Sequence, residues 1–177
     1  MRATQFPNDS REGALMEEDE IISLVNQAKY LYLREISEPQ ENSFRLVEEA
    51  VENGYETGSA RDPASPFFEI LKDARPIEST DKSKSFELHW NQYVAYLVTD
   101  EVVGSGGDHE DEIYTGKLVR VYTKSHFLDH LSRDTDGHIE PILHYKVVCL
   151  NHLIDVASYR PPEARLLNTS QSKVRPN

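Results

Sequence analysis

The spacing of apolar residues changes about halfway along the chain. In residues 15–75 they recur every three or four positions, which is typical of one face of a helix. Ile21, Leu24 and Val25 begin this pattern, which continues to Tyr32. The acidic residues 17–20 precede it, where the helix dipole favours negative charge. The pattern therefore predicts a first helix that starts at these acids and reaches Tyr32.

Two more helices are expected in the same half. Asn42 or Ser43 is a suitable cap for the second, which would end at the turn residues 53–54. The third would start at Pro63 or Pro66, because proline is tolerated in the first turn of a helix. A polar connection is expected over residues 76–84.

From residue 85 onward the apolar period becomes two. Phe86, Leu88 and Trp90 alternate with polar residues, as in a strand that buries one face. Further strands are expected at residues 93–103 and 113–122. A short helix capped by Ser125 should follow before the chain returns to strand at residue 143.

The last two strands are expected to form a hairpin with Asn151 and His152 at the centre of its turn. This register pairs Cys149 with Ile154. In this register the side chains of the two strands divide between the core face and the opposite face of the sheet. The core set is Tyr145, Val147, Cys149, Ile154 and Val156, and the opposite set is His144, Lys146, Val148, Asp155 and Ala157. The prolines at 161–162 are expected to end the sheet.

Helices first and strands second, without βαβ alternation, predict an α+β fold. We expect N-terminal helices packed on a four- to five-stranded, mostly antiparallel sheet, with one short helix inserted between strands. Residues 15–167 should form one domain, helical over 15–75 and sheet-rich over 85–160. Residues 1–14 and 168–177 are polar and aperiodic, so disordered tails are expected there.

Charge and composition restrict the partners. There are 31 acidic and 19 basic side chains, a formal net charge of −12, so the average surface repels nucleic acid and anionic membranes. No apolar run is long enough to cross a bilayer, and the N-terminus lacks an export signal. The single cysteine, Cys149, is typical of a buried thiol in a reducing compartment. We therefore expect a cytoplasmic protein that binds neither nucleic acid nor membrane, and its oligomeric state stays open.

A metal site is the first chemistry to consider, because His126 and His130 have the spacing that lets a helix offer two imidazoles to one ion. No Glu follows the first histidine, and no third ligand lies at a fixed later offset. The helical phase places both histidines opposite Phe127, Leu128 and Leu131, and therefore on the solvent side. We expect no metal and no cofactor.

A catalytic site is the second possibility. On the outward face of the sheet His144 would act as base, Asp155 would orient its imidazole, and Arg120 would hold negative charge, with Glu101 as a further acid. The alternative is a set of cross-strand ion pairs, because polar residues alternate on any half-exposed antiparallel sheet.

An acidic loop favours a binding role instead. Glycines at 104, 106 and 107 are followed by four carboxylates, which would repel phosphate from a glycine-rich cradle. Such a loop is typical of one of two roles, solubility or docking to a basic partner, and the second fits the net charge. Residues expected to contribute to binding are Tyr96, Lys146, Asn151, Asp108, Glu110, Asp111 and Glu112.

Residues 86–162 also carry a set of recognisable segments. They are residues 93–101 (YVAYLVTDE), Gly116-Lys117-Leu118 with Tyr122, Ser125 and Leu128-Asp129, then His144-Tyr145, and residues 151–156 (NHLIDV). This set resembles a small bacterial α+β family with no assigned activity. The resemblance implies that polar signature residues lie at strand ends, around Glu101, His144 and residues 151–155.

The sequence thus favours a non-enzymatic acidic binding protein, most concretely one similar to immunity or inhibitor proteins that cover a basic macromolecule. The alternative is a small hydrolase or lyase using His144, Asp155, Arg120 and Glu101.

Overall fold

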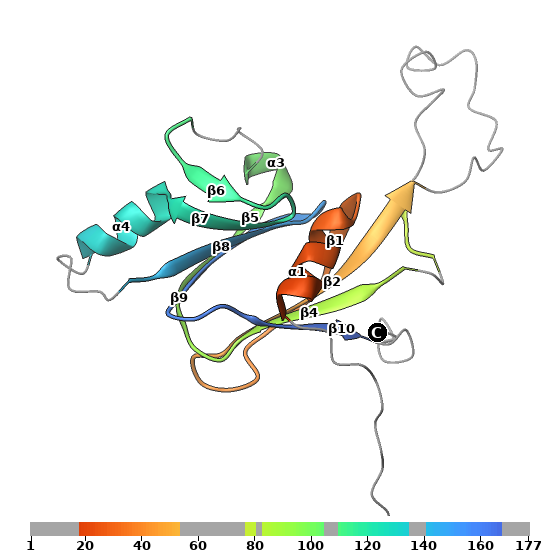
Figure 1. Ribbon diagram of the computed structural model, residues 1–177, viewed down its shortest axis with the longest axis horizontal. Helices are drawn as coiled ribbons and strands as arrows, with labels where there is room; N and C mark the ends of the chain where they lie inside the picture. Colours follow the sequence, from red (N-terminus) through yellow and green to blue (C-terminus); the bar gives the residue numbers. More distant parts are fainter. Residues whose placement is uncertain (1–17, 54–76, 81–82, 105–109, 135–140, 168–177) are drawn as a thin grey trace, which may run out of the picture.

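Figure 1 shows the computed structural model, which describes residues 18–53, 77–80, 83–104, 110–134 and 141–167. Within these residues the chain forms two five-stranded antiparallel sheets and three helices. The helices are α1 (Glu18–Gln27), α3 (Glu101–Gly104) and α4 (His126–Asp134). The mostly antiparallel α+β class is thereby confirmed, but one sheet covered by helices is replaced by two sheets.

The first sheet has the order β1-β2-β4-β10, with β3 beside β2. Its strands are β1 (Tyr30–Ser37), β2 (Phe44–Asn53), β3 (Ile77–Glu78), β4 (Ser85–Trp90) and β10 (Glu163–Leu167). The second sheet has the order β5-β9-β8-β7-β6. Its strands are β5 (Tyr93–Asp100), β6 (Ile113–Thr115), β7 (Val119–Lys124), β8 (Leu143–Val148) and β9 (His152–Ser158).

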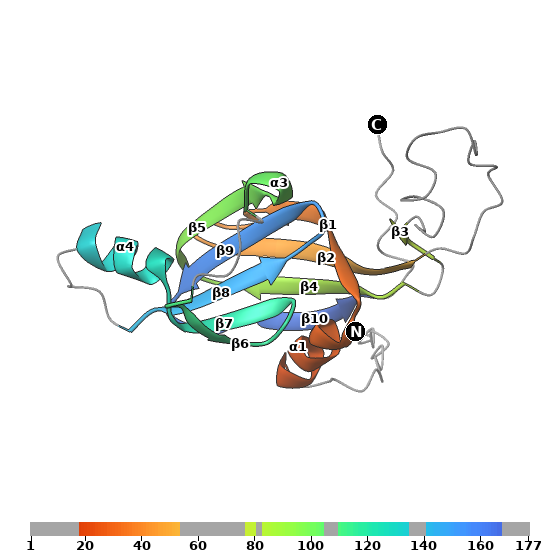
Figure 2. The same cartoon turned by 90° about the horizontal axis from the view of Figure 1, so that it is seen from above.

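The core lies between the two sheets (Figure 2). Leu31, Leu46 and Leu88 come from the first sheet, and Val147 and Ile154 come from the second; all are almost completely buried. Helix α1 packs beside β10 and β7 at one margin of this core. Burial of these aliphatic side chains from both sheets is the main stabilising contribution to the fold.

Asn26 attaches α1 to the β6–β7 hairpin. Its Oδ1 accepts hydrogen bonds from the backbone N–H groups of Lys117 (2.9 Å), Leu118 (2.7 Å) and Val119 (3.0 Å), and its Nδ2 donates to the Val119 carbonyl (3.3 Å). Gly116 makes this turn possible, since its φ is 90° and a Cβ there would lie 2.1 Å from the Val119 oxygen. The strand expected over residues 113–122 is therefore divided into β6 and β7.

We expect Asn26→Ala to lower the free energy of unfolding by about 2–4 kcal/mol, because it leaves two partly buried N–H groups and one exposed N–H group without their acceptor. Urea denaturation followed by circular dichroism measures this loss. The exposed neighbour Gln27 is the matched control, and Gln27→Ala should change stability by less than about 0.5 kcal/mol. Equal effects of the two substitutions would contradict the role given to Asn26.

The helical predictions for the first half are correct only at its start. The first helix is confirmed, but it ends at Gln27, and residues 30–37 form β1. The second helix is wrong, because residues 44–53 form β2. The third predicted helix lies outside the described residues, as do both predicted tails. The connection over residues 76–84 contains the short strand β3.

Local signals near β2 explain that error. Asn42 has a φ of 60° and lies in the turn before β2, while Ser43 Oγ bonds the backbone of Gln40. Both residue types favour such turns as strongly as helix caps. The inward face of β2 includes Glu48, which pairs with Leu33 and Phe86 in the neighbouring strands. Because a carboxylate stands at this inward position, the alternation of apolar and polar residues that is typical of a strand cannot be seen in β2.

Two features near the end of the chain also differ from expectation. The β8–β9 hairpin pairs Val147 with Ile154, so the predicted pairing of Cys149 with Ile154 is wrong by two residues. Because the shift is even, each side chain keeps its predicted face. The prolines at 161–162 were expected to end the sheet, but β9 already ends at Ser158, and after the prolines the chain forms β10 against β4 of the first sheet.

Glu48 is the most unusual residue of the core. It is fully buried, and neither carboxylate oxygen has a hydrogen-bond partner among the described residues. Burial raises the pKa of Glu48 from an ordinary value of 4.5 to about 8, an effect that the nearby Glu87 adds to and Arg45 opposes. The carboxyl group therefore stays protonated in the folded protein at neutral pH.

Stability should consequently fall between pH 4.5 and about 8, where the unfolded chain releases this proton and the folded chain keeps it. Below that range both states are protonated, and above it both are ionised. The loss is on the order of 5 kcal/mol, at about 1.4 kcal/mol per pKa unit. Glu48→Gln should remove most of this pH dependence in urea unfolding at pH 5 and pH 9. The exposed Glu52→Gln should leave it unchanged, and a persistent slope in Glu48→Gln would assign it to other groups.

Candidate functional site

The outer face of the second sheet, which points away from the first sheet, carries a cluster of polar residues that are buried or, for Lys146, half-buried. We call Ser125, His144, Lys146 and Asp155 the His144 network. His144 lies on β8 and Asp155 on the adjacent β9, each alternating with an inward side chain. Lys146 is the direct cross-strand partner of Asp155. Ser125 comes from the residue that immediately precedes α4.

Hydrogen bonds link the members of the network into a line. His144 Nε2 lies 2.9 Å from Asp155 Oδ1, and His144 Nδ1 lies 2.8 Å from Ser125 Oγ. The Leu128 N–H donates to the same Ser125 oxygen over 3.1 Å, which is the expected cap of α4. A neutral imidazole protonated on Nε2 satisfies every contact: its N–H donates to Asp155, and the Ser125 hydroxyl donates to Nδ1.

Lys146 completes the charge balance. Its Nζ lies 3.3 Å from Asp155 Oδ1, so the carboxylate is held between an imidazole and an ammonium group. Partial burial alone would lower the pKa of Lys146, but Asp155, Tyr122 and Glu112 together raise it above its ordinary value. Lys146 therefore stays charged at neutral pH, as its carboxylate partner requires.

The network resembles a Ser-His-Asp triad in composition but not in access. The ring of Tyr122 stacks on the imidazole with centroids 4.4 Å apart, and Phe127 lies 5.1 Å from it. Ser125 and His144 are each 1% exposed, and Asp155 is 7% exposed. The two ring nitrogens also face the opposite partners from those of a serine protease. In this structure the Ser125 hydroxyl caps a helix and does not reach a substrate.

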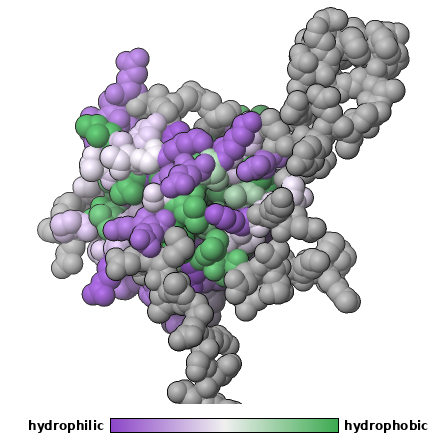
Figure 3. Space-filling model, turned by 45° about the vertical axis from the view of Figure 1, so that its right-hand side comes forward, coloured by the Kyte–Doolittle hydropathy of each residue, from purple (hydrophilic) through white to green (hydrophobic). Residues whose placement is uncertain are grey.

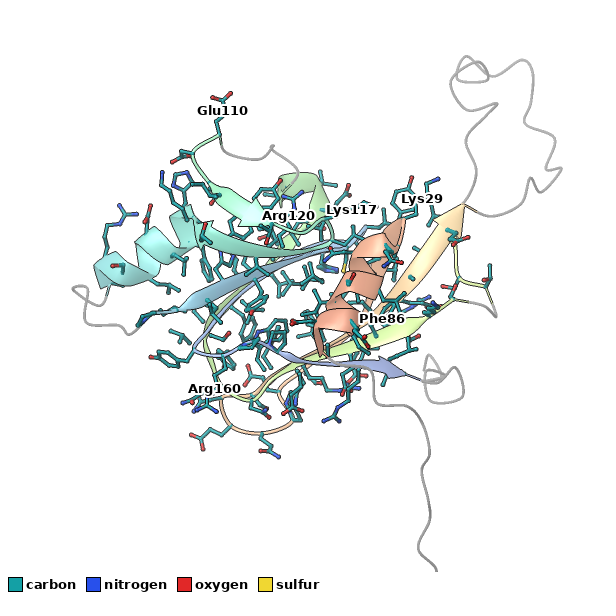
Figure 4. All side chains as sticks on the ribbon, viewed as in Figure 1. Lys29, Phe86, Glu110, Lys117, Arg120 and Arg160 are labelled. Atoms are coloured by element: carbon teal, nitrogen blue, oxygen red, sulfur yellow. The ribbon has the colours of Figure 1, made fainter. Side chains whose placement is uncertain are left out.

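Two predicted catalytic residues lie elsewhere. Arg120 is the cross-strand partner of Lys146, but its guanidinium lies 4.5 Å over the Tyr114 ring and its Nε donates to the Lys117 carbonyl. Figure 4 shows Arg120 beside Lys117. Glu101 begins α3 just after Asp100, whose partner His152 is three residues, about 10 Å, along β9 from Asp155. The structure thus joins His144 and Asp155, as predicted, without Arg120 or Glu101.

The two helix histidines are exposed, as their phase predicts. His126 Nε2 lies 3.1 Å from Asp111, and His130 Nε2 lies 3.5 Å from Asp134. Arg133 bonds the backbone carbonyl of Asp129. Nowhere among the described residues do three metal-ligating side chains come together.

The acidic loop has a structural role at its end. Asp111 contacts the His126 ring, and Glu112 accepts a hydrogen bond from the His126 backbone N–H over 2.9 Å, at the positive end of α4. Glu110 points away from the molecule (Figure 4). Asp108 lies outside the described residues. Of the acids proposed for binding that are described here, Glu110 and Asp111 are exposed, but Asp111 is engaged by the His126 ring.

The remaining predicted binding residues hold the two sheets together. Tyr96 stacks on Phe44 with centroids 4.2 Å apart, and its hydroxyl donates to Glu38 over 2.9 Å. The Asn151 side chain accepts from the Leu33 N–H (3.0 Å) and donates to the Leu33 carbonyl (3.1 Å). Both residues thus connect the second sheet to elements of the first.

Sequence reasoning missed one exposed surface, which we call the edge surface. It comprises three exposed apolar residues at the end of β5 and in α3, namely Leu97, Val102 and Val103, which are 49%, 81% and 78% exposed, together with the exposed Asp100 and Glu101 that lie between them in the chain. Figure 3 shows one face of the molecule, on which hydrophobic residues form small areas between hydrophilic ones. In the sequence, the edge surface is signalled by the apolar pair Val102 and Val103, which continues the apolar run of the strand beyond Asp100.

Comparisons with protein-family models, with curated proteins and with solved structures find no match to this chain. The resemblance noted for residues 86–162 therefore stays a prediction. In the described part of the chain no helix has the length and apolar character needed to cross a membrane.

The His144 network should contribute to stability through coupled hydrogen bonds. Ser125→Ala removes both the α4 cap and the Nδ1 partner, so we expect a loss of about 1–3 kcal/mol in the free energy of unfolding. His144→Phe should cost a similar amount, and the double variant should lose less than the sum by about 1 kcal/mol. Chemical denaturation of the four proteins measures this coupling. Ser23→Ala, on the exposed side of α1, is the control, and strict additivity would show that the network is not cooperative.

Proposed function

We propose that this protein is a non-enzymatic acidic binding protein of the cytoplasm that docks a basic macromolecular partner, in the manner of an immunity or inhibitor protein. The observation that carries the proposal is the edge surface, where strongly exposed apolar side chains lie beside carboxylates. Clustered exposed apolar residues with a polar rim are typical of protein-binding sites.

Electrostatics support the same reading. The formal net charge of −12 attracts a basic partner from a distance, and Asp100 and Glu101 place negative charge next to Leu97 and Val103. Carboxylates of this kind increase the rate of association, whereas the apolar side chains supply the area that is buried on binding.

A hydrolase or lyase remains the second candidate, and the 2.9 Å contact between His144 and Asp155 favours it, because a base needs such an orienting carboxylate. Arg120 and Glu101, the other two residues of that hypothesis, are not near this pair. The almost complete burial of His144 makes binding the better supported function.

Charge reversal on the edge surface tests the binding proposal. We expect Glu101→Lys to reduce capture of basic proteins from the native lysate by about tenfold at low salt, because it repels the partner where binding occurs. Glu52→Lys, an exposed change of equal charge on β2, should reduce capture much less. Quantitative mass spectrometry of the captured proteins at low and high ionic strength provides the measurement.

Two results would count against the proposal. Equal losses for Glu101→Lys and Glu52→Lys would show that only net charge matters. Turnover of ester or phosphoester substrates that disappears in His144→Ala but persists in Ser23→Ala would favour the enzyme instead.

A further inference from the structure

We propose that the free edge of β5 binds an extended segment of the basic partner as a sixth strand of the second sheet, a segment that is apolar in its centre and carries Lys or Arg at both ends. This inference rests on the proposed binding function and specifies its mode. Addition of a strand to an open sheet edge combines main-chain hydrogen bonds with side-chain contacts on alternate positions.

The first support is the position of β5. It is the last strand of its sheet and pairs with β9 alone. Figure 2 shows β5 at the margin of the sheet, with α3 at the end of the strand. The strand has eight residues, YVAYLVTD, with neither Lys nor Pro among them. Natural edge strands usually carry such residues to prevent pairing with other chains.

The second support is that the other edges of the described sheets are protected. Strand β1 has a bulge at Arg34, and its backbone accepts from Leu150 and bonds the Asn151 side chain. Strand β10 lies beside α1, and β6 has only three residues. Strand β5 has a bulge of its own at Val94, and its Tyr93 N–H donates to the Asn42 carbonyl over 2.9 Å, so its free edge is the stretch of residues 95–100. This stretch is apolar except at its end and is partly exposed, and it is the described edge that best fits strand addition.

The third support is charge at both ends of the strand. Near the start of β5, Glu38 accepts hydrogen bonds from the hydroxyls of Tyr93 (3.2 Å) and Tyr96 (2.9 Å). At its end lie the exposed carboxylates of Asp100 and Glu101. Leu97 is exposed between them, on the outer face of the sheet. A complementary strand is therefore apolar in the middle and basic at each end.

The same charges disfavour a second copy of this chain as the occupant. Antiparallel pairing of two β5 strands would bring Glu38 of each copy toward Asp100 and Glu101 of the other. Like charges on facing strands are destabilising, and no basic residue of β5 offsets them. A basic segment would instead be attracted by the carboxylates at both ends of β5.

A synthetic peptide of alternating Val and Thr, flanked by Lys at each end, is the direct probe. We expect it to bind the full chain in a fluorescence anisotropy titration and to slow amide hydrogen exchange in β5. Methylation of its alternate backbone nitrogens should weaken binding about tenfold or more, because the ladder hydrogen bonds are lost. Replacement of its Lys residues by Glu should weaken binding about as much.

A matched pair of protein variants locates the site. Leu97→Lys places a repelling charge on the β5 edge and should raise the peptide Kd by about tenfold. Leu166→Lys makes the same change at another exposed strand position, on β10 of the first sheet, and should leave the Kd within about twofold. Circular dichroism confirms that both variants are folded.

The outcomes separate this inference from the function on which it rests. Failure of the peptide to bind, or equal binding by its methylated form, overturns strand addition at β5. If charge-dependent capture persists in Leu97→Lys, the binding function survives and the partner docks elsewhere. A dimer in sedimentation velocity that dissociates in Leu97→Lys identifies a second copy as the occupant and overturns the basic segment. Loss of both peptide binding and charge-dependent capture overturns the inference and the proposed function together.

Discussion

The fold depends on the contact between the β8–β9 hairpin and β1. Asn151 satisfies both backbone groups of Leu33, and the Leu150 N–H donates to the Leu31 carbonyl over 2.8 Å. These bonds join the two sheets at their tips and determine where the hairpin turns. The resulting register places Lys146 opposite Asp155. A turn one residue later would place Val148 there and leave the carboxylate without its ammonium partner, so the His144 network depends on this distant contact.

The spacing of apolar residues was sufficient to predict a strand and its buried side where the strand has one buried face. Phe86, Leu88 and Trp90 are buried as their alternation predicts, and the two faces of β8 and β9 are those expected. The spacing was insufficient where a contact between residues far apart in the sequence decides the conformation. Glu48 occupies an inward position of β2, so the residues around it resemble a helix. The turn at Leu150 and Asn151 is stabilised by β1, more than a hundred residues away in sequence, and no local signal reports that.

The candidate site, too, was predicted in one respect and not in another. Alternation put His144 and Asp155 on one face, and the structure confirms that they meet. Whether that face is open could not be read from the chain, because Tyr122 and Phe127 cover the imidazole from two other elements. Arg120 lies next to Lys146 on the face predicted for it, yet its long side chain turns toward Tyr114. Backbone position is thus more predictable than the direction of a flexible side chain.

The polar groups of the outer face are therefore mostly satisfied within the molecule, and this changes where recognition is expected. A buried histidine with both nitrogens bonded and a carboxylate with two cationic or donor partners have little interaction energy left for a ligand. An edge strand is different, since beyond Tyr93, whose N–H donates to the Asn42 carbonyl, the outward N–H and C=O groups of β5 have no neighbouring strand to pair with. The apolar side chains of the edge surface lie at that margin of the second sheet. The fold thus concentrates its unused binding capacity at β5, while His144 and His126 connect α4 to the sheet and to the loop before β6.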